Sequence, residues 1–348
     1  MARQTNTAPG LQQLKAAIKT GSFGKLYFFY GEERYLQEYY LNTLKKKLVS
    51  GPMEDFNYRR LTAENMSIEA LQDAVEAVPM MAEWTMVQVD DYDPFAQNEE
   101  TREKLIALFA GIPEGCCVVF NYDTTPYGRN GKLKKLCDAI KQNGCEVEFA
   151  KQSPAELSDW IARHFKHAGK TITPDLCQYL VFLTGGDMTS LLSEIQKIAA
   201  YSQAPAIVRQ DIDMMVEPVL TAVIFDITDA MAENNYDAAM GKLYTLLHMK
   251  EDPIAILAAV GGHFRKLMTA KTVLSAGHGA DVLMGMIGTN SDYYARKIIH
   301  QAGRLREEFC CKAVTLCYEA DCKMKRSFDD SQRVLELLIL ELAQEAAK

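Results

Sequence analysis

The sequence contains no apolar run that approaches the roughly 20 residues a helix needs to cross a bilayer. Its N-terminal residues MARQTNTAPG are polar and lack the apolar core of a signal peptide, which predicts a cytoplasmic protein. None of the nine cysteines belongs to a C-x-x-C pair, so we expect reduced thiols packed as small core side chains and no metal site. The six histidines have no acid or nucleophile at a telling spacing, and no catalytic triad is predicted.

Composition places the chain among ordinary globular proteins. With 348 residues, 48% of them apolar and 24% charged, it has enough material for two or three domains. The net charge of −8 argues against a protein whose main role is to wrap nucleic acid, although it leaves room for a local basic surface.

The stretch 26–49 reads as a strand, a turn and a helix. Residues 26–30 are β-rich and apolar at every position, which is typical of a strand buried on both faces of a parallel sheet. The turn that follows is Gly31-Glu32-Glu33-Arg34, whereas a working P-loop needs G-x-x-x-x-G-K-[ST] to hold phosphates and magnesium. Two carboxylates at this point would repel a triphosphate. We therefore predict the architecture of a P-loop domain, with a degenerate P-loop and no bound cofactor.

Alternating strands and helices continue through residues 1–150. Strands are predicted at 26–30, 58–61, 85–89, 116–121 and 145–149, and the helices between them at about 33–49, 67–78, 99–109 and 132–141. Parallel neighbours need such crossover helices, so we predict one α/β domain with a doubly wound parallel sheet.

From Ser153 onward the pattern is helical. Ser153-Pro154-Ala155-Glu156 is a capping box with proline at the first helical position, and Thr173-Pro174 and Met188 begin two more helices. This predicts a three-helix domain at 151–218. Residues 219–348 show only helical periods, including helices at 292–309 and 316–325, and form a third, all-helical domain.

This three-part plan resembles the AAA+ clamp-loader subunits, and six stretches in register are similar to the delta-subunit family of the bacterial DNA polymerase III clamp loader. They are YFFYGEERYLQEYY at 27–40, VPMM at 78–81, LTGGDM at 183–188, FDITDA at 225–230, KEDPI at 250–254 and DCKMK at 321–325. The resemblance implies an AAA+-like domain at 1–150, a lid domain at 151–218 and a helical collar for oligomerisation at 219–348.

The resemblance also implies a function. Members of the family bind the beta sliding clamp and open it for loading onto primed DNA in replication, without hydrolysing ATP themselves. They are subunits of a DNA-directed DNA polymerase holoenzyme, whose nucleotidyltransferase activity resides in the complex. The partners implied are the clamp, the delta-prime and gamma/tau ATPase subunits, and primer-template DNA. No membrane is involved.

The family contacts the clamp through a hydrophobic wedge, typically Leu-Phe, before the third strand. The matching positions here are Met80 and Met81, flanked by Pro79 and Trp84. Two flexible thioethers and an indole suit an irregular apolar groove, although ordinary packing under the turn is the alternative interpretation.

A basic segment matches the family's collar region near the primer-template junction. It contains Lys323, Lys325 and Arg326, followed by Phe328, whose ring could stack on an exposed base unless it is part of the core. Two alternative functions remain open from the sequence: a divergent P-loop ATPase acting on nucleic acid, and a purely structural clamp-loader-like scaffold.

Overall fold

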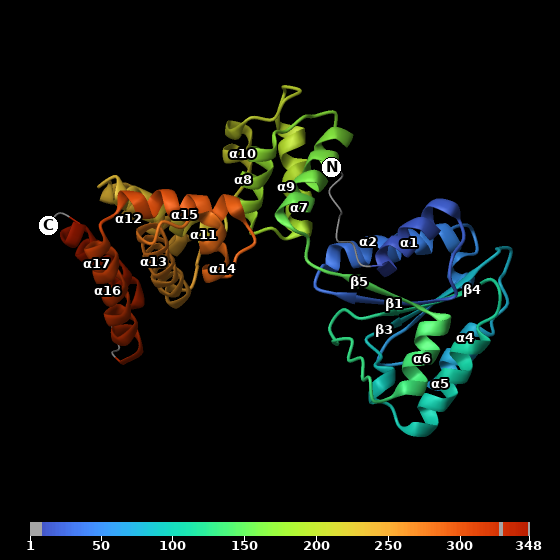
Figure 1. Cartoon of the computed structure of the whole chain (residues 1–348). Coiled ribbons are helices and arrows are strands. Elements are labelled where there is room, and N and C mark those ends of the chain that lie inside the picture. The colour runs from blue at the N-terminus through green and yellow to red at the C-terminus, as the bar shows by residue number, and fades with distance from the viewer. Residues whose placement is uncertain (1–8, 327–329, 347–348) are drawn as a thin grey trace. The chain divides into compact units, whose positions relative to one another are not determined.

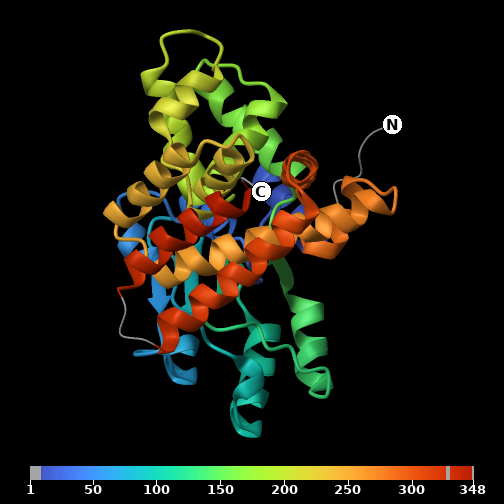
Figure 2. The same cartoon turned by 90° about the vertical axis from the view of Figure 1, so that its left-hand side faces the viewer.

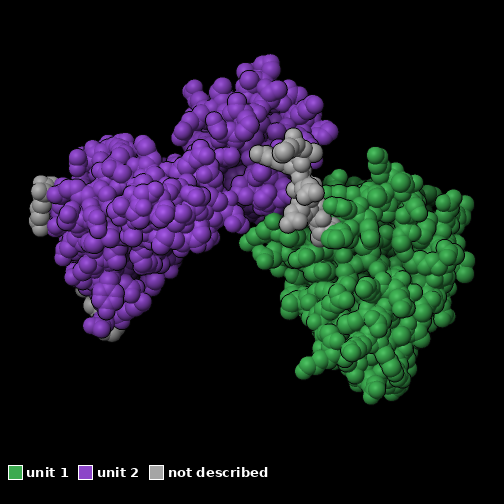
Figure 3. Space-filling model, viewed as in Figure 1, with its two compact units in different colours: residues 1–151 green, residues 152–348 purple. Residues whose placement is uncertain are grey.

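The computed structural model describes residues 9–326 and 330–346 and divides the chain into two compact units (Figure 3). One unit extends to Lys151 and the other begins at Gln152. Each unit has a hydrophobic core of its own. The division of the second unit into a lid and a collar stays a prediction.

A five-stranded, entirely parallel sheet forms the centre of the first unit. The strands are β1 (Leu26–Gly31), β2 (Tyr58–Leu61), β3 (Thr85–Asp90), β4 (Cys116–Asn121) and β5 (Cys145–Phe149). Their order across the sheet is β2-β3-β4-β1-β5, and Phe28 of β1 lies beside Phe120 of β4. The predicted parallel sheet is confirmed.

Helices cover both faces of this sheet (Figure 1). On one face α1 (Pro9–Thr20) and α2 (Arg34–Leu48) pack on Tyr27 and Phe29. On the other, α4 (Ile68–Val75), α5 (Glu99–Gly111) and α6 (Lys134–Asn143) pack on Leu26 and Phe28. Successive side chains of a strand point to opposite faces, which explains why β1 is apolar at every position.

Three short or peripheral elements of this unit were not predicted. They are α1, α3 (Glu54–Asn57) and the 3-10 turn η1 (Pro94–Ala96). Helix α4 also ends at Val75, although the apolar pattern predicted helix as far as residue 78. The buried residues of α2 are Gln37, Leu41, Leu44 and Leu48. Tyr39 has the helical apolar spacing but is exposed.

The second unit is entirely helical apart from one isolated bridge. It begins with α7 (Pro154–His167), α8 (Pro174–Thr184) and α9 (Met188–Tyr201), as predicted, and adds an unpredicted short fourth helix, α10 (Arg209–Met215). The Ser153 capping box forms in full, because the Glu156 side chain accepts from the Ser153 amide at 2.8 Å and the Ser153 hydroxyl accepts from the Glu156 amide.

Seven helices complete the unit and share one large core. They are α11 (Leu220–Ala232), α12 (Tyr236–His248), α13 (Pro253–Ser275), α14 (Ala280–Ile287), α15 (Asp292–Arg304), α16 (Glu307–Arg326) and α17 (Ser331–Ala346). The long α13 packs alongside the red helices α16 and α17 (Figures 1 and 2). The prediction of one helix over 292–309 is wrong, because the chain breaks at Leu305 and α16 starts a new helix there.

Candidate partner-binding surface

The loop between α4 and β3 carries the predicted wedge residues. Helix α4 starts at the Ser67 cap, whose hydroxyl accepts from the Ala70 amide at 3.0 Å, and it buries Leu71 and Val75 against the sheet. It ends three residues before the expected position because Val78 precedes Pro79, and the residue before a proline disfavours the helical conformation. The wedge residues therefore lie on an irregular loop instead of a helix end.

One side chain from another element holds this loop. Asn57, the last residue of α3, donates from Nδ2 to the Met80 carbonyl at 2.8 Å and accepts from the Met80 amide at 2.7 Å. The next residue, Met81, has a φ of 50° and so lies in the left-handed region. This conformation turns the chain sharply back toward β3.

The result is a cluster of exposed apolar side chains. Val78 is 82% exposed, Met80 49% and Met81 89%. Single exposed apolar residues are common on proteins, but three within four residues are not the usual pattern. Phe56, which is 61% exposed and adjacent to Asn57, adds an aromatic that the sequence analysis missed. We call Val78, Met80 and Met81 the apolar loop surface.

Trp84 is placed differently from the other predicted clamp residues. Its ring is half-buried against the core under α1 and α2 and meets the Phe23 ring edge to face, with centroids 6.1 Å apart. Pro79 is partly buried within the loop. The structure therefore exposes Met80 and Met81 together with Val78 on one loop, while Trp84 packs against the core.

The turn after β1 occupies the position where a P-loop would cradle phosphate. Gly31 has a φ of 138°, and a Cβ on it would lie 2.2 Å from the Phe149 carbonyl oxygen. The Glu33 amide, which could otherwise face an anion, donates to that same carbonyl at 2.9 Å. The backbone of this turn is thus hydrogen-bonded to β5. The two residues that precede α2, Glu32 and Glu33, are acidic, and the first turn of α2 contains no acidic residue.

The acids at the end of β3 are also engaged. The Asp91 carboxylate accepts from the backbone amides of residues 123–125, each at 2.9 Å, and from the Thr124 hydroxyl. These donors lower the pKa of Asp91 despite the burial that opposes them. Asp90 pairs with Arg60 at 2.6 Å. Both carboxylates at the end of β3 are thus engaged by donors of the chain itself.

Neutral amides fill the space beside those acids. Gln37 of α2 donates from Nε2 to the Asn121 side chain at 2.9 Å and to the Tyr122 carbonyl at 2.8 Å. Asn121 in turn donates to Asp90, which also accepts from Gln88. This buried network lies at the carboxyl ends of β3 and β4, the edge at which open α/β sheets bind ligands.

The predicted DNA-contacting residues lie at the end of α16. Lys323 is within 3.8 Å of Glu341, Lys325 pairs with Asp321 at 2.8 Å, and Arg326 is exposed. These carboxylates offset part of the basic charge on which the prediction depends. Phe328 lies outside the described residues.

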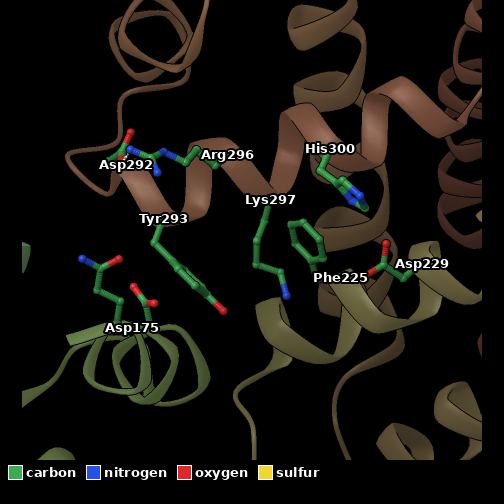
Figure 4. Close-up of a pocket in the computed structure, with 9 residues that line it drawn as sticks. Asp175, Phe225, Asp229, Asp292, Tyr293, Arg296, Lys297 and His300 are labelled. Carbon is green, nitrogen blue, oxygen red and sulfur yellow. Dashed lines mark ion pairs between the residues drawn. The ribbon is translucent and has the colours of Figure 1, made fainter. Parts of the chain in front are cut away.

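A cavity of about 400 Å³ opens between α8, α11 and α15 (Figure 4). Tyr293 and Lys297 extend into it from α15, and burial lowers the pKa of Lys297. The Lys297 ammonium lies 4.7 Å from the Phe225 ring centroid, and Arg296 pairs with Asp292 at 2.6 Å. The lining mixes acidic and basic groups with aromatic rings, and this mixture selects no class of ligand.

The described residues offer no cluster of three or more histidine, cysteine or acidic side chains arranged to hold a metal ion. All nine cysteines are free, and burial raises the pKa of several, Cys310 to about 11. The buried thiols with a raised pKa, such as Cys310 and Cys317, therefore stay protonated at neutral pH. Among the helices of residues 9–326 and 330–346, none is both long and apolar enough to span a membrane.

Comparison with known proteins first identifies the fold. The solved structure of the Bacillus subtilis DNA clamp loader delta protein superposes with a TM-score of 0.59 at 23% identity, and the match covers 96% of this chain and 99% of that one. The parallel sheet followed by an all-helical region is thus the clamp-loader delta fold.

Sequence comparison then identifies the family. The model for the DNA polymerase III delta subunit matches residues 27–150, and the model for its C-terminal domain matches 221–342. The Bacillus subtilis (strain 168) DNA polymerase III subunit delta is 26% identical over 338 residues, 95% of this chain and 96% of the relative. The probable delta subunit of Aquifex aeolicus (strain VF5) is 21% identical over 93% of both chains. The chain belongs to the delta-subunit family of DNA polymerase III.

Proposed function

We propose that this chain binds the beta sliding clamp and holds it open for loading onto primed DNA, without hydrolysing ATP itself. The observation that carries the proposal is the apolar loop surface, where Val78, Met80 and Met81 are displayed in a family of replication proteins. Full burial of one large apolar side chain stabilises a complex by about 1.5–3 kcal/mol, so two methionines suffice to bias a strained ring interface. Flexible thioethers also adapt to an irregular groove.

The proposal assigns ATP hydrolysis to neighbouring subunits. The delta-prime and gamma/tau subunits would assemble with this chain through helices of residues 219–348, and their ATP-driven rearrangement would expose the loop. Supporting this division of labour, the turn at Gly31 is committed to β5 and Asp91 is occupied by backbone amides. The ring is shifted toward its open form only because the loop binds that form more tightly.

The proposal also includes a contact with primer-template DNA at the end of α16. Lys325 and Lys323 both have acidic neighbours, which leaves Arg326 as the better candidate. An exposed arginine at a helix end suits a phosphate contact.

A titration of the purified chain with purified clamp tests the central claim. Replacing Met80 and Met81 together with serine removes two apolar contacts, so we expect the dissociation constant to rise by about 30-fold or more. Met286→Ser is the matched control, because Met286 is 59% exposed on α14 of the other unit. An unchanged affinity for the double variant would contradict the proposal and favour the alternative of a purely structural clamp-loader-like scaffold.

A second titration separates the proposal from the ATPase alternative. A fluorescent ATP analogue should show no saturable binding to the isolated chain at micromolar concentrations. Micromolar binding would favour a divergent ATPase that holds nucleotide through backbone amides.

A further inference from the structure

The loop that carries Met80 and Met81 has very little hydrogen bonding of its own. Within the described chain, the backbone of residues 77–84 makes two hydrogen bonds, and both join Met80 to the Asn57 side chain. The sequence separation is 23 residues, so this contact ties the loop to a different part of the sheet edge. The conformation of the wedge therefore depends on one amide.

The chemistry of that amide suits the task. A primary amide both donates and accepts, so it satisfies the carbonyl and the amide of a single residue at once. Asn57 does this for Met80, and Nδ2 also donates to the Met53 carbonyl at 3.1 Å, which fixes the orientation of the side chain. With Asn57 only 2% exposed, water cannot readily replace these bonds.

Backbone geometry shows what the anchor maintains. Met81 follows the anchored residue in the left-handed conformation, which non-glycine residues adopt at a cost in free energy. In that conformation its side chain is 89% exposed. A loop without the anchor would be free to return Met81 to an extended conformation and to lose this display.

We propose that Asn57 is a positioning residue for the partner contact: it pre-orders the Met80–Met81 loop so that both thioethers are presented before the clamp arrives. This inference rests on the proposed function, because it assumes that the loop is the contact. A pre-ordered loop avoids the loss of conformational entropy that binding would otherwise impose. Asn57 itself need not touch the clamp.

Two substitutions remove the anchor while leaving both methionines in place. Asn57→Ala deletes the amide, and Asn57→Asp keeps the shape but turns an acceptor toward the Met80 and Met53 carbonyls. We expect each to weaken clamp binding by about tenfold or more, measured by titration of the full chain. The control is Asn98→Ala, which removes the cap whose side chain accepts from the Thr101 amide at 2.8 Å, far along the chain from the loop. It should bind within about twofold of the unchanged chain.

The outcomes distinguish the positioning role of Asn57 from the proposed clamp binding on which it rests. If the Asn57 variants bind normally while the Met80→Ser, Met81→Ser variant does not, the positioning role is wrong and the proposed function stands. If the methionine variant itself binds normally, the proposed function fails first.

Amide hydrogen exchange on the unaltered chain, without clamp, gives a test that needs no variant to fold. The Met80 amide should exchange much more slowly than the amides of Met81 and Ala82, because it alone has an acceptor in this segment. Exchange at Met80 as fast as at those neighbours would overturn the inference.

Discussion

His263 is a neutral histidine at the centre of the helical unit. Its Nε2 lies 2.5 Å from the Gln301 Oε1, and Gln301 in turn donates to the Thr228 hydroxyl at 2.9 Å and to Asp229 at 2.8 Å. Because the Gln301 amide nitrogen donates to these groups, its oxygen accepts and His263 donates from Nε2. The network joins α13, α15 and α11 through one buried polar chain.

Burial lowers the pKa of His263 from 6.5 to about 4, against the raising effect of Gln301. The unfolded chain therefore binds a proton below pH 6.5 that the folded chain does not bind until about pH 4, so stability falls across this window as pH falls. We expect His263 to cost about 2 kcal/mol of unfolding free energy between pH 7 and pH 5. Urea unfolding of the unaltered chain and of His263→Gln at both pH values measures it. A difference between the two proteins that does not change with pH would contradict the assignment.

At the scale of elements, the turn between β1 and α2 shows how closely two strands constrain a short connection. Gly31 lies against the end of β5, and a Cβ there would meet the Phe149 carbonyl oxygen at 2.2 Å, with a φ of 138° that side chains rarely adopt. We expect Gly31→Ala to lower the unfolding free energy of the first unit by about 2 kcal/mol or more. Urea unfolding followed by circular dichroism measures the loss.

Gly111 provides the matched control for that substitution. It ends α5, has no positive φ, and a Cβ on it would meet nothing within 4 Å. Gly111→Ala should therefore be neutral or stabilising by up to about 1 kcal/mol, because alanine restricts the unfolded chain. Equal effects at both glycines would mean that the turn can move away from β5.

The elements themselves differ in how well the sequence predicts them. Strands β1, β3 and β4 follow from apolar runs, and the capped helices α7, α8 and α13 follow from Ser, Thr or Asp before proline. The end of α4 was predicted three residues too late, at residue 78, although Pro79 disfavours a helical conformation at Val78. Helix α3 and the break at Leu305 were missed, since four residues carry no period and an apolar stripe continues through the break.

The candidate site depends on the local sequence and also on contacts between residues distant in the sequence. The resemblance to the delta-subunit family pointed to Pro79, Met80 and Met81, but the contact between Asn57 and Met80 spans 23 residues and no local pattern encodes it. The half-buried place of Trp84 follows likewise from Phe23, which is distant in sequence. The resemblance thus indicated which residues to consider, and the tertiary contacts that hold and expose them required the structure.

At the scale of the whole molecule, the two units carry separate tasks in the proposed function. Residues up to Lys151 contain both the apolar loop surface and the side chain that anchors it, together with cores on both faces of the sheet. The proposed assembly helices all lie beyond Gln152. Nothing in the anchoring of the loop requires a residue of the second unit.

A fragment of residues 1–151 should therefore fold by itself and keep the clamp affinity of the full chain within about threefold, or roughly 0.6 kcal/mol. Cooperative urea unfolding shows first that the fragment is folded, and titration with the clamp then gives its dissociation constant. The complementary fragment, 152–348, should show no clamp binding in the same assay. A folded 1–151 fragment with greatly weakened binding would place part of the clamp contact on the helical unit, because the loop and its anchor would both be intact.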